Sequence, residues 1–72
     1  MKYEYFINLD ERGEFYSDVR VASTGRTVSE FDTEEAIEWA EDGYNIRDPE
    51  TVLMNLIERG IVRKGSTITK GN

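Results

Sequence analysis

The 72-residue sequence contains no cysteine and no histidine. Without cysteine the chain has neither a disulfide nor a thiolate ligand for zinc, so its stability must come from the packing of apolar side chains. Without histidine it lacks the commonest general base and a usual ligand of transition metals. These absences argue against catalysis, and we expect a protein that is not an enzyme and that binds no metal or cofactor.

The sequence also lacks any apolar run that approaches the roughly 20 residues of a membrane-spanning helix. Its first residues alternate apolar and charged side chains, which is not the pattern of a signal peptide. Together with the absence of cysteine, this pattern favours a soluble protein of the cytoplasm. A chain of this length forms one domain with a thin core, to which its eight aromatic residues must contribute much of the packing.

Charge of one sign is concentrated in the middle of the chain. The formal net charge is −6, yet residues 30–50 hold nine acids and one base, a local charge of 1 − 9 = −8. From Arg59 onward there are four bases and no acid. An acidic middle segment repels the phosphates of nucleic acid, so we expect a protein partner with a basic surface and no direct nucleic-acid or membrane partner.

Two segments alternate apolar and polar residues with the period of a β-strand, residues 2–9 and 15–22. The intervening residues have turn chemistry, and we predict a three-residue loop at 11–13 with Gly13 in the left-handed conformation. This loop sets the register of the hairpin by placing Leu9 opposite Phe15, Tyr5 opposite Val19 and Tyr3 opposite Val21. On the outer face Glu4 then lies opposite Arg20, which is a favourable cross-strand pair.

A third strand is predicted over residues 26–31, with two possible registers. A three-residue turn at 23–25 places Phe31 opposite Ser17, whereas a two-residue loop at 24–25 places Val28 opposite Val21. The first register is favoured because a small serine leaves room for the phenylalanine ring.

Two helices follow the strands, and both begin at an acidic cap. Asp32 has the properties of an N-cap for a helix over 33–42, with Phe31 folding onto Ala36 as a staple. Asp48 and Pro49 begin a second helix over 49–59, which ends at Gly60. We expect Ile61 to pack back onto Leu56, and the residues after it form a basic tail at 60–72.

These elements predict a single α+β domain over residues 1–72. A three-stranded antiparallel β-meander over 2–31 is covered on one face by two short helices, in the order βββαα. A short fourth strand is a further possibility, at 61–64 or at 66–69, and residues 70–72 are expected to fray. The expected core consists of Tyr3, Tyr5, Ile7, Leu9, Phe15, Val19, Val21, Phe31, Ile37, Ala40, Val52, Leu53, Leu56 and Ile57, with Trp39 at its rim.

The first candidate binding surface is a ladder of carboxylates on and just before the first helix. At about 100° per residue, five of them fall within an arc of roughly 120°. One interpretation is a solvated face that keeps the protein soluble, although no base lies three or four residues away to relieve the repulsion. The other is mimicry of nucleic acid, because carboxylates recur about every 5.4 Å along the helix, close to the phosphate spacing. The ladder consists of Glu30, Glu34, Glu35, Glu38, Glu41 and Asp42.

The second candidate surface is the outer face of the hairpin. Phe6 and Tyr16 lie diagonally across it, surrounded by Glu4, Asp18 and Arg20. Exposed aromatic rings among charges are typical of the centre of a protein interface. The alternative is that the two rings only shield the hairpin backbone.

The segments Thr27-Val28 and Phe31-Asp32-Thr33-Glu34-Glu35, followed by Trp39, come after a tyrosine-rich hairpin. In this plan the chain resembles small phage- and plasmid-borne anti-defence proteins, type I anti-CRISPR proteins among them. The resemblance covers about a dozen residues. It implies a stoichiometric inhibitor in the cytoplasm of a bacterial host, which occludes the nucleic-acid-binding or nuclease-recruiting surface of a CRISPR effector complex or nuclease. We expect a monomer in preference to a dimer. The alternative is a structural or regulatory module that self-associates or binds a partner through the aromatic sheet face.

Overall fold

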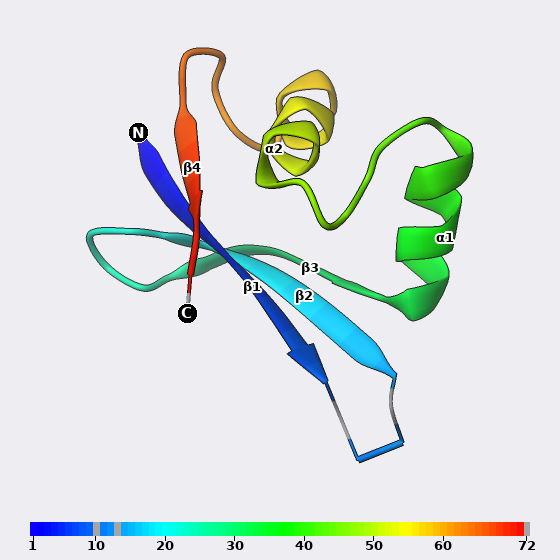
Figure 1. Cartoon of the computed structure of the whole chain (residues 1–72). Coiled ribbons are helices and arrows are strands. Elements are labelled where there is room, and N and C mark those ends of the chain that lie inside the picture. The colour runs from blue at the N-terminus through cyan, green and yellow to red at the C-terminus, as the bar shows by residue number, and fades with distance from the viewer. Residues whose placement is uncertain (10, 13, 72) are drawn as a thin grey trace.

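The computed structural model of the chain describes residues 1–9, 11, 12 and 14–71. Its fold is α+β, with one four-stranded mixed sheet and two helices (Figure 1), so the expected class is confirmed. Along the sheet the strand order is β3-β2-β1-β4. In chain order the elements are β1 (Lys2–Leu9), β2 (Phe15–Val21), β3 (Thr27–Asp32), α1 (Thr33–Glu41), α2 (Pro49–Glu58) and β4 (Thr67–Lys70).

Strands β1 and β2 form the predicted antiparallel hairpin. Tyr5 lies opposite Val19 and Glu4 opposite Arg20, which confirms the register expected from the alternation of apolar and polar residues. The Tyr5 hydroxyl donates a hydrogen bond of 3.2 Å to Ser17 Oγ, and burial raises the pKa of this tyrosine. The predicted conformation of Gly13 lies outside the described residues.

The pairing of β2 with β3 combines a correct prediction with a wrong one. Phe31 lies opposite Ser17, as the favoured register requires, but the register shifts between Val19 and Arg20. This bulge leaves Val28 without an opposite residue, and Val28 packs against the core. The turn therefore spans the four residues 22–25 instead of three, closed by a 2.8 Å bond from Gly25 N to the Val21 carbonyl.

The fourth strand replaces the expected basic tail and changes the architecture of the sheet. β4 pairs with β1 in parallel, with Ile68 beside Tyr3, so the sheet is mixed and not a pure meander. The candidate segment 66–69 was correct within one residue, and 61–64 forms no strand. Gly71 is not frayed, because its N–H donates a 2.7 Å hydrogen bond to the Tyr5 carbonyl. A parallel connection requires a crossover, here through α2, which the local sequence pattern does not reveal.

Both helices begin at their predicted caps. Asp32 accepts a hydrogen bond of 3.0 Å from Glu35 N, and Asp48 accepts one of 3.2 Å from Glu50 N. Each helix ends one residue earlier than predicted, in a Schellman motif. In α1 this motif is closed by a 2.8 Å bond from Tyr44 N to the Trp39 carbonyl.

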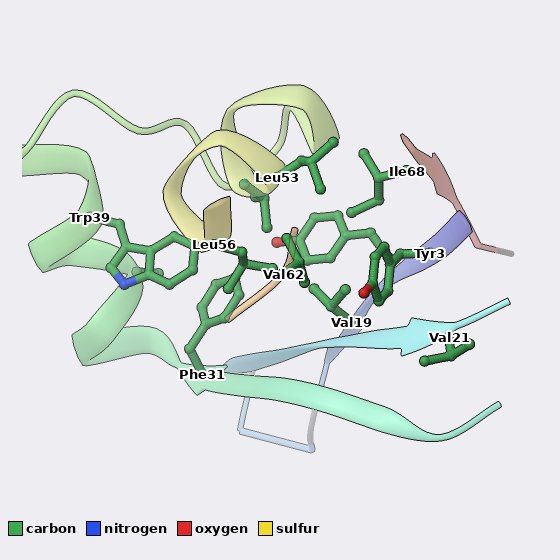
Figure 2. Packing of buried hydrophobic residues seen from close by; sticks show 12 residues of the cluster. Tyr3, Val19, Val21, Phe31, Trp39, Leu53, Leu56, Val62 and Ile68 are labelled. Atoms are coloured by element: carbon green, nitrogen blue, oxygen red, sulfur yellow. The ribbon is translucent and has the colours of Figure 1, made fainter. Parts of the chain in front are cut away.

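The core fills the space between one face of the sheet and the two helices (Figure 2). Figure 2 shows Phe31 extending from β3 to lie beside Trp39, and the two rings stack at 4.2 Å between centroids. Trp39 is only 5% exposed and is therefore a core residue, which corrects its expected place at the rim. The buried cluster consists of Tyr3, Tyr5, Val19, Val21, Phe31, Ala36, Trp39, Val52, Leu53, Leu56, Val62 and Ile68.

The orientation of α1 differs from the prediction. Ile37 is 56% exposed and Ala40 is exposed, so both were wrongly assigned to the core, whereas Ala36 and Trp39 are buried. The buried side of the helix is rotated toward the larger Trp39 side chain because this ring can stack on Phe31.

The core also differs from the prediction outside α1. After α2, Ile61 is 44% exposed, whereas the next residue, Val62, was not predicted as a core residue and is only 6% exposed. Ile7 and Ile57 are partly buried against the core, whereas the predicted places of the Leu9 and Phe15 side chains lie outside what the structure describes. Within the described chain, neither helix has the length and apolar content that a membrane span requires.

Candidate protein-binding surface

The predicted carboxylate ladder forms a continuous exposed surface on α1 and the adjoining end of β3. All six of its carboxylate residues are exposed. Among the residues that the structure describes, none of these carboxylates has an ion-pair partner. We call this set the acidic surface, and it comprises Glu30, Glu34, Glu35, Glu38, Glu41 and Asp42.

The rotation of α1 adds an apolar side chain to the acidic surface. Ile37 is 56% exposed and stands one helical turn from both Glu34 and Glu41. An exposed isoleucine at the border of a carboxylate surface adds apolar area to it, and protein interfaces combine both kinds of group. Ile37 was not predicted as part of this surface, because it was assigned to the core and Trp39 to the rim.

A shallow hollow beside α1 links the acidic surface to the sheet. Tyr16, which is 49% exposed, lines this hollow of about 360 Å³ together with Glu30 and Glu35. Tyr16 was predicted as part of the second candidate surface, the outer face of the hairpin. The hollow therefore brings one residue of that surface next to the acidic surface. An aromatic face beside carboxylates is a set of groups that binds guanidinium and ammonium cations.

The remaining residues of the outer sheet face interact mainly with one another. The Arg20 guanidinium donates to Asp18 Oδ2 at 2.9 Å and lies 4.2 Å above the Phe6 ring centroid. Asp18 is only 4% exposed, although it was expected to be part of an exposed surface, and Phe6 is half-buried against Gly71. Glu4 is half-buried opposite Arg20. This arrangement favours the interpretation that Phe6 shields the sheet.

Among the residues that the structure describes, the buried polar atoms Asn8 Nδ2 and Asp18 Oδ1 on the outer face have no hydrogen-bond partner. These atoms belong to adjacent positions on the hairpin, because Asn8 pairs with Tyr16 and Asp18 with Phe6.

A cleft of about 270 Å³ lies between the two helices, and its lining includes Glu38, Asp42 and Glu58. Two of its side chains bond to each other: the Tyr44 hydroxyl donates to Glu58 Oε2, and this hydrogen bond raises the pKa of Tyr44. Arg59 lies 5.8 Å from the centroid of the Trp39 ring. In the described part of the chain, no three or more carboxylates converge to hold a metal ion.

The geometry thus presents groups suited to recognition: unpaired carboxylates, one exposed isoleucine and one exposed tyrosine. Comparison of the chain with protein-family models, with curated proteins and with solved structures finds no match.

Proposed function

We propose that this chain is a non-enzymatic binding protein that docks its acidic surface on a cationic surface of another protein. The observation that supports this proposal best is Ile37, which is 56% exposed among carboxylates that have no ion-pair partner in the described chain. A face needed only for solubility requires no apolar side chain. A docking face needs both kinds of group.

The charged and apolar groups have different parts in this docking. The carboxylates attract a basic partner over long range and raise the association rate at low salt. Ile37 supplies apolar area at one border of the acidic surface and Tyr16 at the other, and such area loses its water on binding and contributes to the affinity of an interface. The hollow beside Tyr16 suits an arginine of the partner, since Glu30 and Glu35 can accept hydrogen bonds from its guanidinium.

The preferred partner is a surface that otherwise binds nucleic acid. Glu34, Glu38 and Glu41 repeat once per helical turn, at about the spacing of successive phosphates. The resemblance to anti-CRISPR proteins makes this proposal more specific: the chain inhibits a bacterial defence complex by occluding its nucleic-acid-binding or nuclease-recruiting surface. The absence of histidine and cysteine agrees with a stoichiometric inhibitor and not a catalyst.

The test is affinity capture from bacterial lysate at low and high salt, with a pair of variants matched in charge. E34K/E38K/E41K and E11K/E14K/E50K each change the net charge from −6 to 0, but only the first alters the acidic surface. We expect the first variant to lose the proteins that the wild type retains at low salt, and the second to keep them. Circular dichroism checks that both variants are folded. If both variants retain the same proteins, the acidic surface is not the docking site.

A second measurement isolates Ile37 once a partner has been captured. I37A should leave the association rate unchanged and increase the dissociation rate, because apolar contacts act after the charged encounter. Surface plasmon resonance measures both rates. An unchanged dissociation rate would mean that Ile37 does not contribute to binding and that the acidic surface acts through its charges alone.

A further inference from the structure

A second surface lies at the end of the sheet near the β2–β3 turn, away from α1 (Figure 1). It is a groove of about 710 Å³ between the sheet and the segment that connects α2 to β4. Its floor is apolar and its rim is cationic. We call it the basic groove, and its principal lining residues are Val28, Ile61, Val62, Arg26, Arg63 and Lys64.

The charge of this groove is opposite to that of the protein. Three of the nine basic residues border it, in a chain of net charge −6. Arg26, Arg63 and Lys64 are exposed, and none has an ion-pair partner among the described residues. The described lining also includes no carboxylate. The cations are therefore available to an external anion.

The segment that carries two of these cations is held in place. Ser66 is 8% exposed, and its hydroxyl donates a hydrogen bond of 2.7 Å to the Arg63 carbonyl. Gly65, with φ of 90°, completes this tight turn, and Val62 anchors its start in the core at 6% exposure. Since the backbone is fixed, binding an anion requires ordering of the side chains only.

We propose that the basic groove binds a short segment of a partner protein in which carboxylates alternate with aliphatic side chains. The carboxylates would pair with the three cations, and the aliphatic groups would cover Val28 and the exposed Ile61. The volume lies within the range of about 300–1,000 Å³ that is usual for ligand pockets, which suits a peptide segment better than a broad protein face. This inference does not depend on the function proposed for the acidic surface.

Nucleic acid fits the groove less well than an acidic peptide. Phosphates would meet the cations, but an apolar floor offers them no partner. A duplex that extends beyond the groove would also enter the field of the acidic segment 30–50, whose local charge is 1 − 9 = −8. A short peptide with a few carboxylates remains within the cationic rim.

The test is a titration of the isotope-labelled protein with the acetylated, amidated hexapeptide (Asp-Leu)₃, monitored by amide chemical shifts. We expect saturable shifts of residues 26–28 and 61–66. R63E/K64E should weaken binding by about tenfold, or about 1.4 kcal/mol, because two attractive contacts with the carboxylates of the peptide become repulsive. R47E/K70E makes the same change in net charge with exposed residues outside the groove and should bind as the wild type does.

Several outcomes would overturn the proposal. An absence of saturable shifts, or equal affinity in R63E/K64E and R47E/K70E, would exclude the groove as the binding site. Equal binding of (Asp-Ser)₃ would show that the apolar floor takes no part. Stronger binding of a 12-base-pair DNA duplex with the same shifts would identify nucleic acid as the occupant. Shifts of these amides on raising the protein concentration alone would identify a second copy of the chain.

Discussion

At the scale of single residues, the stacked pair Phe31 and Trp39 determines which side of α1 faces the core. We predict that W39A lowers the free energy of unfolding by about 3–5 kcal/mol, as is usual when a buried aromatic residue is truncated. I37A on the same helix should change it by less than about 0.5 kcal/mol, since Ile37 is 56% exposed.

Urea unfolding followed by far-ultraviolet circular dichroism measures both variants. The comparison is informative because the helix propensity of alanine favours both substitutions alike. Equal losses of stability would mean that α1 buries both side chains. Ile37 would then not be an exposed residue of the acidic surface.

The orientation of α1 shows what sequence periodicity can and cannot predict at this scale. Ala36 and Ala40 lie directly opposite the carboxylates, but both are too small to define a packing face. Ile37 and Trp39 each lie about 100° from the centre of the acidic arc, on opposite sides. Periodicity therefore leaves the choice between them open, and the stacking of Trp39 on Phe31, a contact between two elements, decides it.

At the scale of elements, Gly71 and Phe6 connect the end of β4 to β1. A Cβ atom at position 71 would lie 2.5 Å from Phe6 Cε1, so any side chain there must displace the ring. We predict that G71A lowers the free energy of unfolding by about 1–3 kcal/mol, the usual cost of overpacking. In an F6A background the same substitution should cost much less, because the ring is no longer in the way.

A double-mutant cycle with urea unfolding measures this coupling. T69A, at an exposed position of the same strand, is a suitable control and should behave alike in both backgrounds. If G71A lowers the free energy of unfolding equally with and without the phenylalanine ring, Gly71 does not lie close against Phe6.

The elements themselves were predictable to different extents. The β1–β2 hairpin, both helix caps and the pairing of Phe31 with Ser17 follow from residues close together in the sequence, and all were predicted. The pairing of Tyr3 with Ile68 joins positions 68 − 3 = 65 residues apart. No local pattern encodes such a contact. The four residues of β4 are also too few for the sequence to predict which strand β4 pairs with or whether the pairing is parallel.

At the scale of the whole molecule, opposite charges are separated between the acidic surface and the basic groove. The acidic surface should destabilise the fold, because Glu38 has carboxylates four residues away on both sides, at Glu34 and Asp42. We predict that E38K raises the free energy of unfolding by about 0.5–1 kcal/mol at low salt, as two repulsive pairs become attractive. The gain should decrease as salt screens the charges.

Thermal unfolding at low and high concentrations of sodium chloride measures this effect. E50K is the matched control: it changes the net charge equally, but it removes a carboxylate from the first turn of α2, where the helix dipole favours it. E38K should therefore stabilise the protein and E50K should not. If E38K is the less stable of the two, charge repulsion on α1 is not a significant cost.

The position of β4 has a consequence for how the chain is made. Because β4 pairs with β1, β1 leaves the ribosome well before the strand that covers its second edge has been synthesised. During that interval the second edge of β1 is open to pairing with other chains. Lys2 and Glu4 on β1 place charges beside that edge, and charged side chains are a usual means by which edge strands avoid such pairing.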